Sequence, residues 1–444
     1  MVRQYFGTDG VRGTVGKDPM TADFTMRLAS AAAQVLVPKG GTVVIGKDTR
    51  LSGYMLESAL EAGFVAAGAN VLLIGPLPTP GIARLTQEFD ADLGVVISAS
   101  HNPYFDNGIK FFNRAGSKLT DDVELAIEEH LKHAAITLES SHLGKAKRID
   151  TARIRYQEFC VSTMPAGVNL EGLKIVFDGA NGASYKVGPR SLAELGAQVI
   201  PIGCSPNGRN INDGCGSTQP GLLKSTVPAV EADVGVALDG DGDRVLLVDE
   251  NGDAVDGDQL LYVLATARAS EGELRGPVVG TVMSNLGLEH ALKEKDIDFR
   301  RAKVGDRYVL ETLEATGGVI GGETSGHMIV LDKATTGDGL VSALQVLAVM
   351  KQTGKKLSEL VAGMPKYPQT MLNVRTEKRM NPDDSPAIQA AVKEVEEELS
   401  DRGRVVLRAS GTEPVIRVMV EGVDAEQVSS MARRLAAVVE DAAA

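Results

Sequence analysis

The chain contains, at residues 93–103, the stretch LGVVISASHNP, in which a short apolar run ends abruptly in small and polar residues. The apolar run has the composition of a buried strand, and polar residues just past such a strand lie where open α/β sheets bind ligands. Pro103 fixes its own φ and favours an extended Asn102, so the loop is stiff. A stiff loop can hold the Ser100 hydroxyl in one direction. We therefore predict that it carries the chemistry, although a plain polar turn is the better explanation of this segment when it is taken alone.

The rest of the chain predicts an α/β fold. Strand–turn–helix–strand units at 42–74, 173–200 and 278–299 indicate three related α/β domains with mixed, largely parallel sheets covered on both faces. Residues 370–439 follow the order β-α-β-β-α, which indicates a smaller C-terminal α+β domain. Since 444 residues exceed one ordinary core, we predict four domains, at residues 1–150, 151–252, 253–366 and 367–444.

Composition excludes several classes of function. The net charge of -13 argues against broad nucleic-acid binding, which needs a basic surface. No apolar run reaches membrane-spanning length, and the N-terminus lacks the apolar run of a signal peptide. The cysteines, Cys160, Cys204 and Cys215, are scattered and odd in number, which fits a reducing compartment. The expectation is a cytoplasmic protein without nucleic-acid or membrane partners.

A second polar loop, DGDGDR at residues 239–244, follows the apolar run 234–238. Its three carboxylates, Asp239, Asp241 and Asp243, stand at alternate positions, and without a cation their repulsion would be costly in a closed site. Oxygen ligands indicate a hard ion, Mg²⁺ or Ca²⁺. The glycine that an EF-hand needs at its sixth position is replaced by Arg244, so we expect no EF-hand.

Three further segments carry groups that suit a phosphorylated ligand. GGVIGGETSGH at residues 317–327 brings together a Glu, a Ser and a His that can bind hydroxyl or phosphate oxygens. RASGTEP at residues 408–414 combines an arginine, two hydroxyls and an unshielded glycine N–H, which suits a phosphate. FGTDGVRG at residues 6–13 predicts a mobile polar loop that could wrap a ligand. Each segment alone also fits an ordinary solvated loop.

Four of these motifs, in this order, resemble the signatures of the α-D-phosphohexomutase family: Ser-His-Asn-Pro, Asp-Gly-Asp-Gly-Asp-Arg, Gly-Glu-x-Ser-Gly-His and Arg-x-Ser-Gly-Thr-Glu-Pro. The resemblance covers the whole chain, with one motif in each predicted domain. It implies that the four domains surround a central cleft. It also implies a phosphoserine enzyme that moves a phosphoryl group between two positions of a bound sugar.

The resemblance implies a role for each matching residue. Ser100 would be the phosphoserine, and Asp239, Asp241 and Asp243 would hold one Mg²⁺ per chain together with the Ser100 phosphate. Arg244 and Lys110 would flank the transferred phosphoryl group, and either Lys110 or His101 would be the acid/base. The implied substrate-binding residues are Thr8, Arg12, Arg50, Glu323, Ser325, His327, Arg408, Ser410, Gly411 and Thr412.

Other segments narrow the resemblance to bacterial members that act on amino-sugar phosphates; they lie at 5–13, 46–53, 106–112 and 304–308. The implied reaction interconverts glucosamine 6-phosphate and glucosamine 1-phosphate, for UDP-N-acetylglucosamine synthesis. A sugar 1,6-bisphosphate would serve as activator and bound intermediate. The partner would be a small phosphosugar, and a homodimer is a family-level expectation. Thr324 stands where these members usually carry Gln.

Three other functions remain open at this point. A phosphoglucomutase or phosphomannomutase would use the same mechanism on another sugar. A metal-dependent phosphatase would let water attack the phosphoserine, but it would not need the distal phosphate loop at 408–414. A sugar-phosphate binding protein without catalysis would bind ligand and show no turnover.

Overall fold

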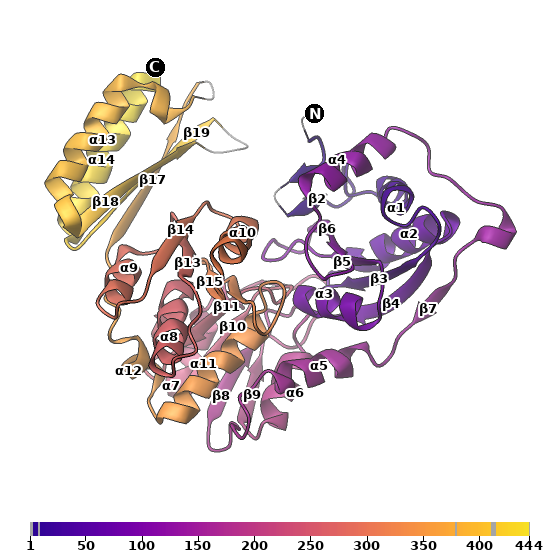
Figure 1. The fold of residues 1–444 in the computed structure, drawn as a ribbon, viewed down its shortest axis with the longest axis horizontal. Helices are drawn as coiled ribbons and strands as arrows, with labels where there is room; N and C mark the ends of the chain where they lie inside the picture. Colours follow the sequence, from indigo (N-terminus) through magenta and orange to yellow (C-terminus); the bar gives the residue numbers. More distant parts are fainter. Residues whose placement is uncertain (1–2, 8, 378–379, 410–413, 444) are drawn as a thin grey trace.

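The computed structural model describes the chain except for residues 1–2, 8, 378–379, 410–413 and 444 (Figure 1). Its sheets form four successive units, in agreement with the predicted class of three α/β domains and a smaller C-terminal α+β domain. The mixed sheets of the first three units are mostly parallel, and the fourth sheet is antiparallel.

The first domain has a seven-stranded sheet in the order β1-β2-β6-β5-β3-β4-β7. Helices α1, α2 and α4 share one apolar core on one face of it, while Ile82 of α3 belongs to the core that continues into the next domains. The elements are β1 (Phe6–Gly7), β2 (Gly10–Thr14), α1 (Ala22–Leu36), β3 (Thr42–Lys47), α2 (Ser52–Ala66), β4 (Asn70–Pro76), α3 (Thr79–Glu88), β5 (Leu93–Ile97), β6 (Asp106–Asn113), α4 (Asp121–His130) and β7 (Ala146–Arg148).

The second domain has a five-stranded sheet in the order β12-β11-β10-β8-β9. Its elements are α5 (Ala152–Ser162), β8 (Lys174–Asp178), α6 (Val187–Glu194), β9 (Gln198–Ile202), α7 (Gly221–Ala229), β10 (Val234–Leu238), β11 (Val245–Val248) and β12 (Ala254–Val255). Because Val255 pairs with Leu247, this sheet continues past the boundary that the sequence predicts at residue 252.

The third domain has a four-stranded sheet in the order β14-β13-β15-β16. Its long helix α11 is buried along most of its length, as expected for a helix between packed domains. The elements are α8 (Gly257–Ser270), β13 (Val278–Thr281), α9 (Leu286–Lys293), β14 (Phe299–Ala302), α10 (Asp306–Thr316), β15 (Ile320–Gly322), β16 (Met328–Val330), α11 (Gly339–Thr353) and α12 (Leu357–Val361).

The fourth domain is a three-stranded sheet, β17-β19-β18, with α13 and α14 packed on one face (Figure 1). It has its own apolar core and joins the third domain through polar contacts; Arg404, for example, donates to the Ser284 carbonyl at 2.6 Å. The elements are β17 (Gln369–Arg375), α13 (Pro386–Leu399), β18 (Gly403–Ala409), β19 (Val415–Gly422) and α14 (Ala425–Ala443).

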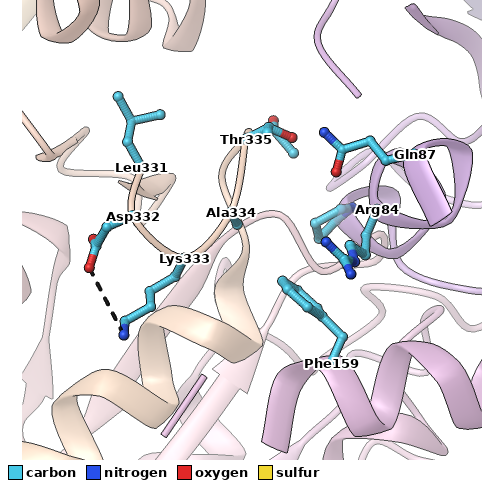
Figure 2. Close-up of a pocket in the computed structure, with 10 residues that line it drawn as sticks. Arg84, Gln87, Phe159, Leu331, Asp332, Lys333, Ala334 and Thr335 are labelled. Atoms are coloured by element: carbon cyan, nitrogen blue, oxygen red, sulfur yellow. Dashed lines mark ion pairs between the residues drawn. The ribbon is translucent and has the colours of Figure 1, made fainter. Parts of the chain in front are cut away.

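The first three domains also meet at a small pocket of about 110 Å³, between α3, α5 and the loop 331–336 (Figure 2). The Arg84 guanidinium lies over the Phe159 ring, 4.7 Å from its centroid. The Lys333 amine turns instead toward Asp332, at 4.0 Å. Since the two cations do not converge, this pocket is a junction between packed domains rather than a binding site.

The N-terminal segment 6–13 differs from the mobile loop that its glycines predict. Its two short strands pair as Phe6 with Val11 and Gly7 with Gly10, and Val11 also pairs with Ile109 of β6. Phe6 and Val11 are both buried. The apolar side chains therefore fix this segment to the sheet in spite of its polar, Gly-rich composition.

Candidate active site

The predicted motif loops follow the carboxyl ends of strands in their own domains. The serine loop, which carries Ser100, follows β5, and the aspartate loop, which carries Asp239, Asp241 and Asp243, follows β10. The glutamate loop, which carries Glu323, follows β15, and Arg408 is the penultimate residue of β18. This is the edge at which open α/β sheets bind ligands. The topology therefore explains why motifs more than a hundred residues apart meet.

Ser100 is buried and is held in an unusual conformation. Its φ of 53° is in the left-handed region, which is uncommon for residues other than glycine, and its N–H donates to Ser98 Oγ at 2.9 Å. Its own Oγ donates to Asp239 Oδ2 at 2.6 Å and lies 3.3 Å from His101 Nδ1. Backbone strain of this kind is typical of functional sites. The loop thus aims the Ser100 hydroxyl at the carboxylates, as a phosphoryl-accepting serine would require.

Arg50 supports this loop from below. Its guanidinium donates to the carbonyl of Ser100 at 3.1 Å and that of Asn102 at 2.6 Å, and it pairs with Asp48. The side chain is completely buried. The sequence analysis expects Arg50 to bind the substrate; in this structure its hydrogen bonds go to the loop that carries Ser100. Asn212, which the sequence did not single out, donates to the same two carbonyls.

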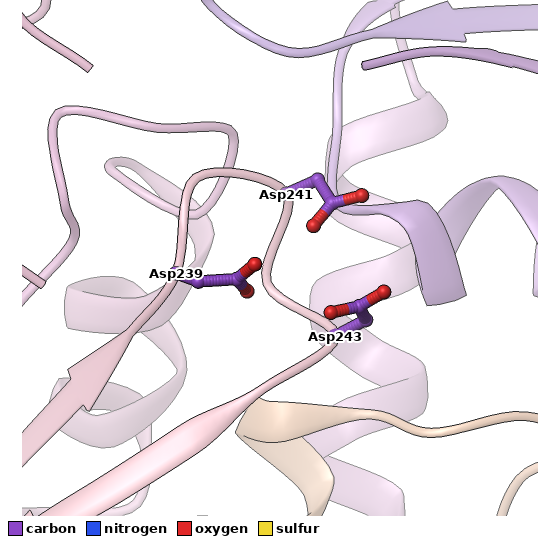
Figure 3. Close-up of side chains that lie close together, drawn as sticks. All are labelled: Asp239, Asp241 and Asp243. Atoms are coloured by element: carbon purple, nitrogen blue, oxygen red, sulfur yellow. The ribbon is translucent and has the colours of Figure 1, made fainter. Parts of the chain in front are cut away.

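Three carboxylates converge beside Ser100 (Figure 3). Asp239, Asp241 and Asp243 are buried, and each offers an oxygen within 4.8 Å of the others. Gly240 is needed here because a Cβ at that position would lie 2.6 Å from the Ser100 carbonyl oxygen. The glycine spacers therefore let the aspartate loop and the serine loop touch.

The aspartate cluster fits a divalent cation. Within the described residues, Asp241 Oδ1 and Asp243 Oδ1 are buried without a hydrogen-bond partner. Burial, together with the charges of Asp243 and Asp241, raises the pKa of Asp239 well above its usual range. A bound cation would remove this repulsion, and an all-oxygen donor set is the kind that Mg²⁺ or Ca²⁺ prefers.

Lys110 lies among these carboxylates rather than on the cleft surface. Its Nζ is 2.9 Å from Asp241 and from Asp9, and 3.7 Å from Asp243. Burial alone would lower the pKa of Lys110, but these three carboxylates raise it above its usual value. In this structure Lys110 therefore stays protonated and can supply positive charge to a phosphoryl group.

The two histidines of the site have opposite charge states at neutral pH. Burial, followed by the charges of Arg244 and Arg12, lowers the pKa of His101 to about 4. For His327, burial acts in the same direction, but the neighbouring carboxylates of Asp243 and Asp306 raise the pKa to about 9. His101 is therefore a neutral ring beside Ser100, and His327 is a cation.

A cleft of about 540 Å³ passes over Ser100 and is bounded by the first, second, third and fourth domains. Of the predicted residues, the structure places these in its lining: Ser100, His101, Arg12, Asp243, Arg244, Glu323, His327 and Arg408. The cleft therefore has the aspartate loop at one part of its wall and an arginine of the fourth domain at another. The arginine can bind a phosphate directly, whereas the aspartates could do so only through a bound cation.

Some predicted residues do not reach this lining. Ser325 is exposed and is not part of the cleft lining, and its contact with a sugar stays a prediction. Thr324 donates to Asp258 Oδ2 at 2.7 Å, which ties its hydroxyl to α8. Thr8, Ser410, Gly411 and Thr412 lie outside the described residues.

The sequence analysis missed residues that tie the site together. Lys118 Nζ lies 2.6 Å from Asp9 and 2.5 Å from Asp306. Asp306 in turn lies 3.4 Å from His327, which is 3.8 Å from Asp243. Asp9 and Asp306 stand within segments that the sequence analysis quoted, but only the fold reveals that Lys118 joins them.

No helix in the described part of the chain is long and apolar enough to cross a membrane.

Comparison with known proteins supports the same reading of the four domains. The chain matches the phosphoglucomutase/phosphomannomutase α/β/α domain I over residues 3–136, domain II over 155–252, domain III over 256–367 and the C-terminal domain over 371–438. It is 57% identical to a phosphoglucosamine mutase of Aeromonas hydrophila, covering 100% of both chains. It is 56% identical to phosphoglucosamine mutase 1 of Shewanella amazonensis, covering 99% of each.

Solved structures share the fold. A phosphoglucomutase/phosphomannomutase family protein of Burkholderia thailandensis superposes with a TM-score of 0.80 at 22% identity, over 100% of this chain and 98% of the other. An N-acetylphosphoglucosamine mutase of Aspergillus fumigatus, solved with GlcNAc-6P and magnesium, gives a TM-score of 0.71 at 16% identity, over 99% and 96%. The four family domains match in order along the chain, and full-length relatives are more than 50% identical to it. The chain therefore belongs to the phosphoglucomutase/phosphomannomutase family.

Proposed function

We propose that this chain is a phosphosugar mutase that interconverts glucosamine 6-phosphate and glucosamine 1-phosphate. The observation that carries the proposal is the Ser100 hydroxyl, fixed 2.6 Å from Asp239 in a cleft that Arg408 of the fourth domain also lines. The choice of an amino sugar rests on full-length relatives named phosphoglucosamine mutase at 57% and 56% identity.

In the proposed reaction, phosphorylated Ser100 gives its phosphoryl group to the free hydroxyl of the sugar. A phosphorus–oxygen bond to the sugar forms, the bond to Ser100 Oγ breaks, and Oγ receives the proton. The resulting 1,6-bisphosphate turns end for end in the cleft, and its other phosphate returns to Ser100. Arg408 is suited to hold the phosphate that is not transferred.

The residues around Ser100 have distinct proposed tasks. Asp239, Asp241 and Asp243 would hold one Mg²⁺, which when bound supplies positive charge that neutralises the transferred phosphoryl group. Lys110 adds a fixed positive charge from the buried side. Neutral His101 is the better placed of the two acid/base candidates, since its ring nitrogen lies 3.3 Å from Ser100 Oγ.

Further details of the proposal come from the sequence. They are a sugar 1,6-bisphosphate as activator, a cytoplasmic location and a homodimer, and they stay predictions.

The test of this mechanism is the phosphorylation of Ser100. After incubation with Mg²⁺ and glucosamine 1,6-bisphosphate, peptide mass spectrometry should locate one phosphate on Ser100, and Ser100→Ala should lower kcat at least about a thousandfold. Ser140→Ala, at an exposed serine in a short 3-10 helix, is the matched control and should keep wild-type activity. Turnover by Ser100→Ala at the wild-type rate would refute the phosphoserine mechanism.

A further inference from the structure

Two reciprocal ion pairs cross from the first domain to the third. Neighbouring residues at the start of α10 carry opposite charges, and each reaches an opposite charge on the segment 118–121. Asp306 Oδ2 lies 2.5 Å from Lys118 Nζ, and the Arg307 guanidinium pairs with Asp121. We call these four residues the clasp.

Additional contacts fix the clasp on both sides. Arg307 Nη2 also donates to the Leu119 carbonyl at 2.6 Å, and Thr335 of the third domain donates to the Gly116 carbonyl at 3.2 Å. The side chains of Lys118, Asp306 and Arg307 are 17–21% exposed. The Lys118–Asp306 pair is therefore partly shielded from solvent, whereas Asp121 in the other pair is 62% exposed and more open to screening.

The clasp stands between two cavities. Its four residues line the catalytic cleft of about 540 Å³, and the same four line a second cavity of about 380 Å³ behind it. The second cavity is otherwise bounded by polar side chains such as Asn113 and Glu311 and by apolar ones such as Leu310 and Ile329. The ion pairs thus form a wall between the catalytic cleft and a side chamber of mixed lining.

The wall is also connected to the reacting groups. Lys118 shares Asp9 with Lys110, at 2.6 and 2.9 Å, and Asp306 lies 3.4 Å from His327. Lys110 and His327 both face Asp243 of the aspartate cluster. A movement of the clasp would therefore change the shape of the cleft beside the site of phosphoryl transfer.

We propose that the clasp retains the sugar bisphosphate and keeps the side chamber's water from the phosphoryl groups while the intermediate turns. This inference rests on the proposed mutase function. While it turns, the bisphosphate has to give up its contacts with the cleft without dissociating from it. A closed wall is needed during this step, because the ligand then has the fewest contacts with the protein. The clasp residues are positioning residues, because they act through the wall they form.

Opening the wall permits two losses. The bisphosphate can dissociate into solution, which leaves Ser100 unphosphorylated. Alternatively, a water oxygen bonds to phosphorus, the phosphorus–oxygen bond to Ser100 or to the sugar breaks, and the departing oxygen takes a proton, giving inorganic phosphate and a hydroxyl. The amounts of released bisphosphate and of inorganic phosphate can each be compared with the amount of isomerised product.

The experiment measures glucosamine 1-phosphate, released bisphosphate and inorganic phosphate from phosphorylated enzyme with Mg²⁺ and glucosamine 6-phosphate. In Arg307→Met and in Asp121→Asn we expect the ratio of losses to isomerisation to rise about fivefold, the population shift that one partly exposed ion pair can supply. Asp121 also pairs with Arg3, so beyond the loss of that pair the double variant should add little to Asp121→Asn, because both changes remove the Arg307–Asp121 contact. Arg307→Lys keeps the charge and should restore part of the retention.

The matched control is Arg155→Gln, which removes an ion pair of 2.6 Å between Glu88 of the first domain and α5 of the second, away from the cleft lining. The ratio of the two losses to isomerisation in this variant, which we call the loss ratio, should equal that of the wild type. If Arg307→Met does not fold, Asp121→Asn, at a carboxylate that is 62% exposed, carries the test.

Three outcomes would overturn the inference. An unchanged loss ratio in Asp121→Asn, with a raised KM in Arg307→Met, would mean that Arg307 binds the substrate directly. An equal rise in Arg155→Gln would mean general loosening of the domains. A wild-type enzyme that isomerises no hexosamine phosphate would overturn the proposed function itself, and the inference with it.

Discussion

Ser100 Oγ donates a hydrogen bond of 2.6 Å to Asp239 Oδ2, and both atoms belong to buried residues of different domains. The serine is at the end of a strand in the first domain, and the aspartate is at the end of a strand in the second. The contact places a hydroxyl against a carboxylate whose ionised form is disfavoured by its neighbours. Ser100 and the aspartate cluster are therefore brought together only when the two domains pack.

Removal of one charge from the aspartate cluster should stabilise the metal-free protein. Because the pKa of Asp239 is raised well above its usual range, its ionised form opposes folding at neutral pH. Without divalent cations, Asp239→Asn should melt at a higher temperature than the wild type. Added Mg²⁺ should raise the wild-type melting temperature and shift the variant less. Calorimetry measures both melting temperatures, with Asp253→Asn as the control. A wild-type melting temperature that does not change with Mg²⁺ would contradict the assignment of the aspartate cluster as a metal site.

Arg50 should matter for the position of Ser100 rather than for substrate affinity. Arg50→Lys cannot reach the carbonyls of both Ser100 and Asn102 while it pairs with Asp48. We expect a loss of about 2 kcal/mol in the free energy of unfolding, because buried hydrogen bonds to these carbonyls are lost. In kinetics, kcat should fall while KM changes little. The control is Arg434→Lys, at an exposed side chain of α14. A large rise in KM with unchanged kcat would instead support direct substrate binding by Arg50.

The buried carboxyl of Asp258 should give the folding stability a measurable pH dependence. Burial, with the charge of Asp256, raises its pKa to about 6. The folded value exceeds the unfolded value of about 3.9, so the stabilising contribution is complete below about pH 4 and is lost as the pH rises through about 6. Relative to the wild type, Asp258→Asn should therefore gain up to about 3 kcal/mol between pH 4 and pH 7. Denaturant titrations at both pH values test this, and a constant difference between the proteins would refute it.

Much of the fold and part of the site could be predicted from the sequence, for a physical reason. Alternation of strands and helices dictates layered α/β domains, and like charges spaced by glycines make sense only around a cation. Asp239, Asp241 and Asp243 were predicted on that ground, and the structure brings them together.

Other features depend on contacts that sequence patterns do not encode. Lys118 pairs with residues 109 and 188 positions away, so its role becomes visible only when the domains pack. Arg50 was expected at the substrate, and its burial beneath the loop of Ser100 could not be predicted from its charge. The strands at 6–14 were missed because two buried apolar side chains outweigh a Gly-rich composition.

The central claim is that this chain isomerises an amino-sugar phosphate. The most direct test compares kcat/KM for the 6-phosphates of glucosamine, glucose and mannose, with Mg²⁺ and a trace of the matching bisphosphate. We predict at least a tenfold preference for glucosamine 6-phosphate, equal to about 1.4 kcal/mol of transition-state stabilisation. A preference for glucose or mannose 6-phosphate would keep the mechanism and contradict the substrate, and Thr324 would then be the first residue to exchange.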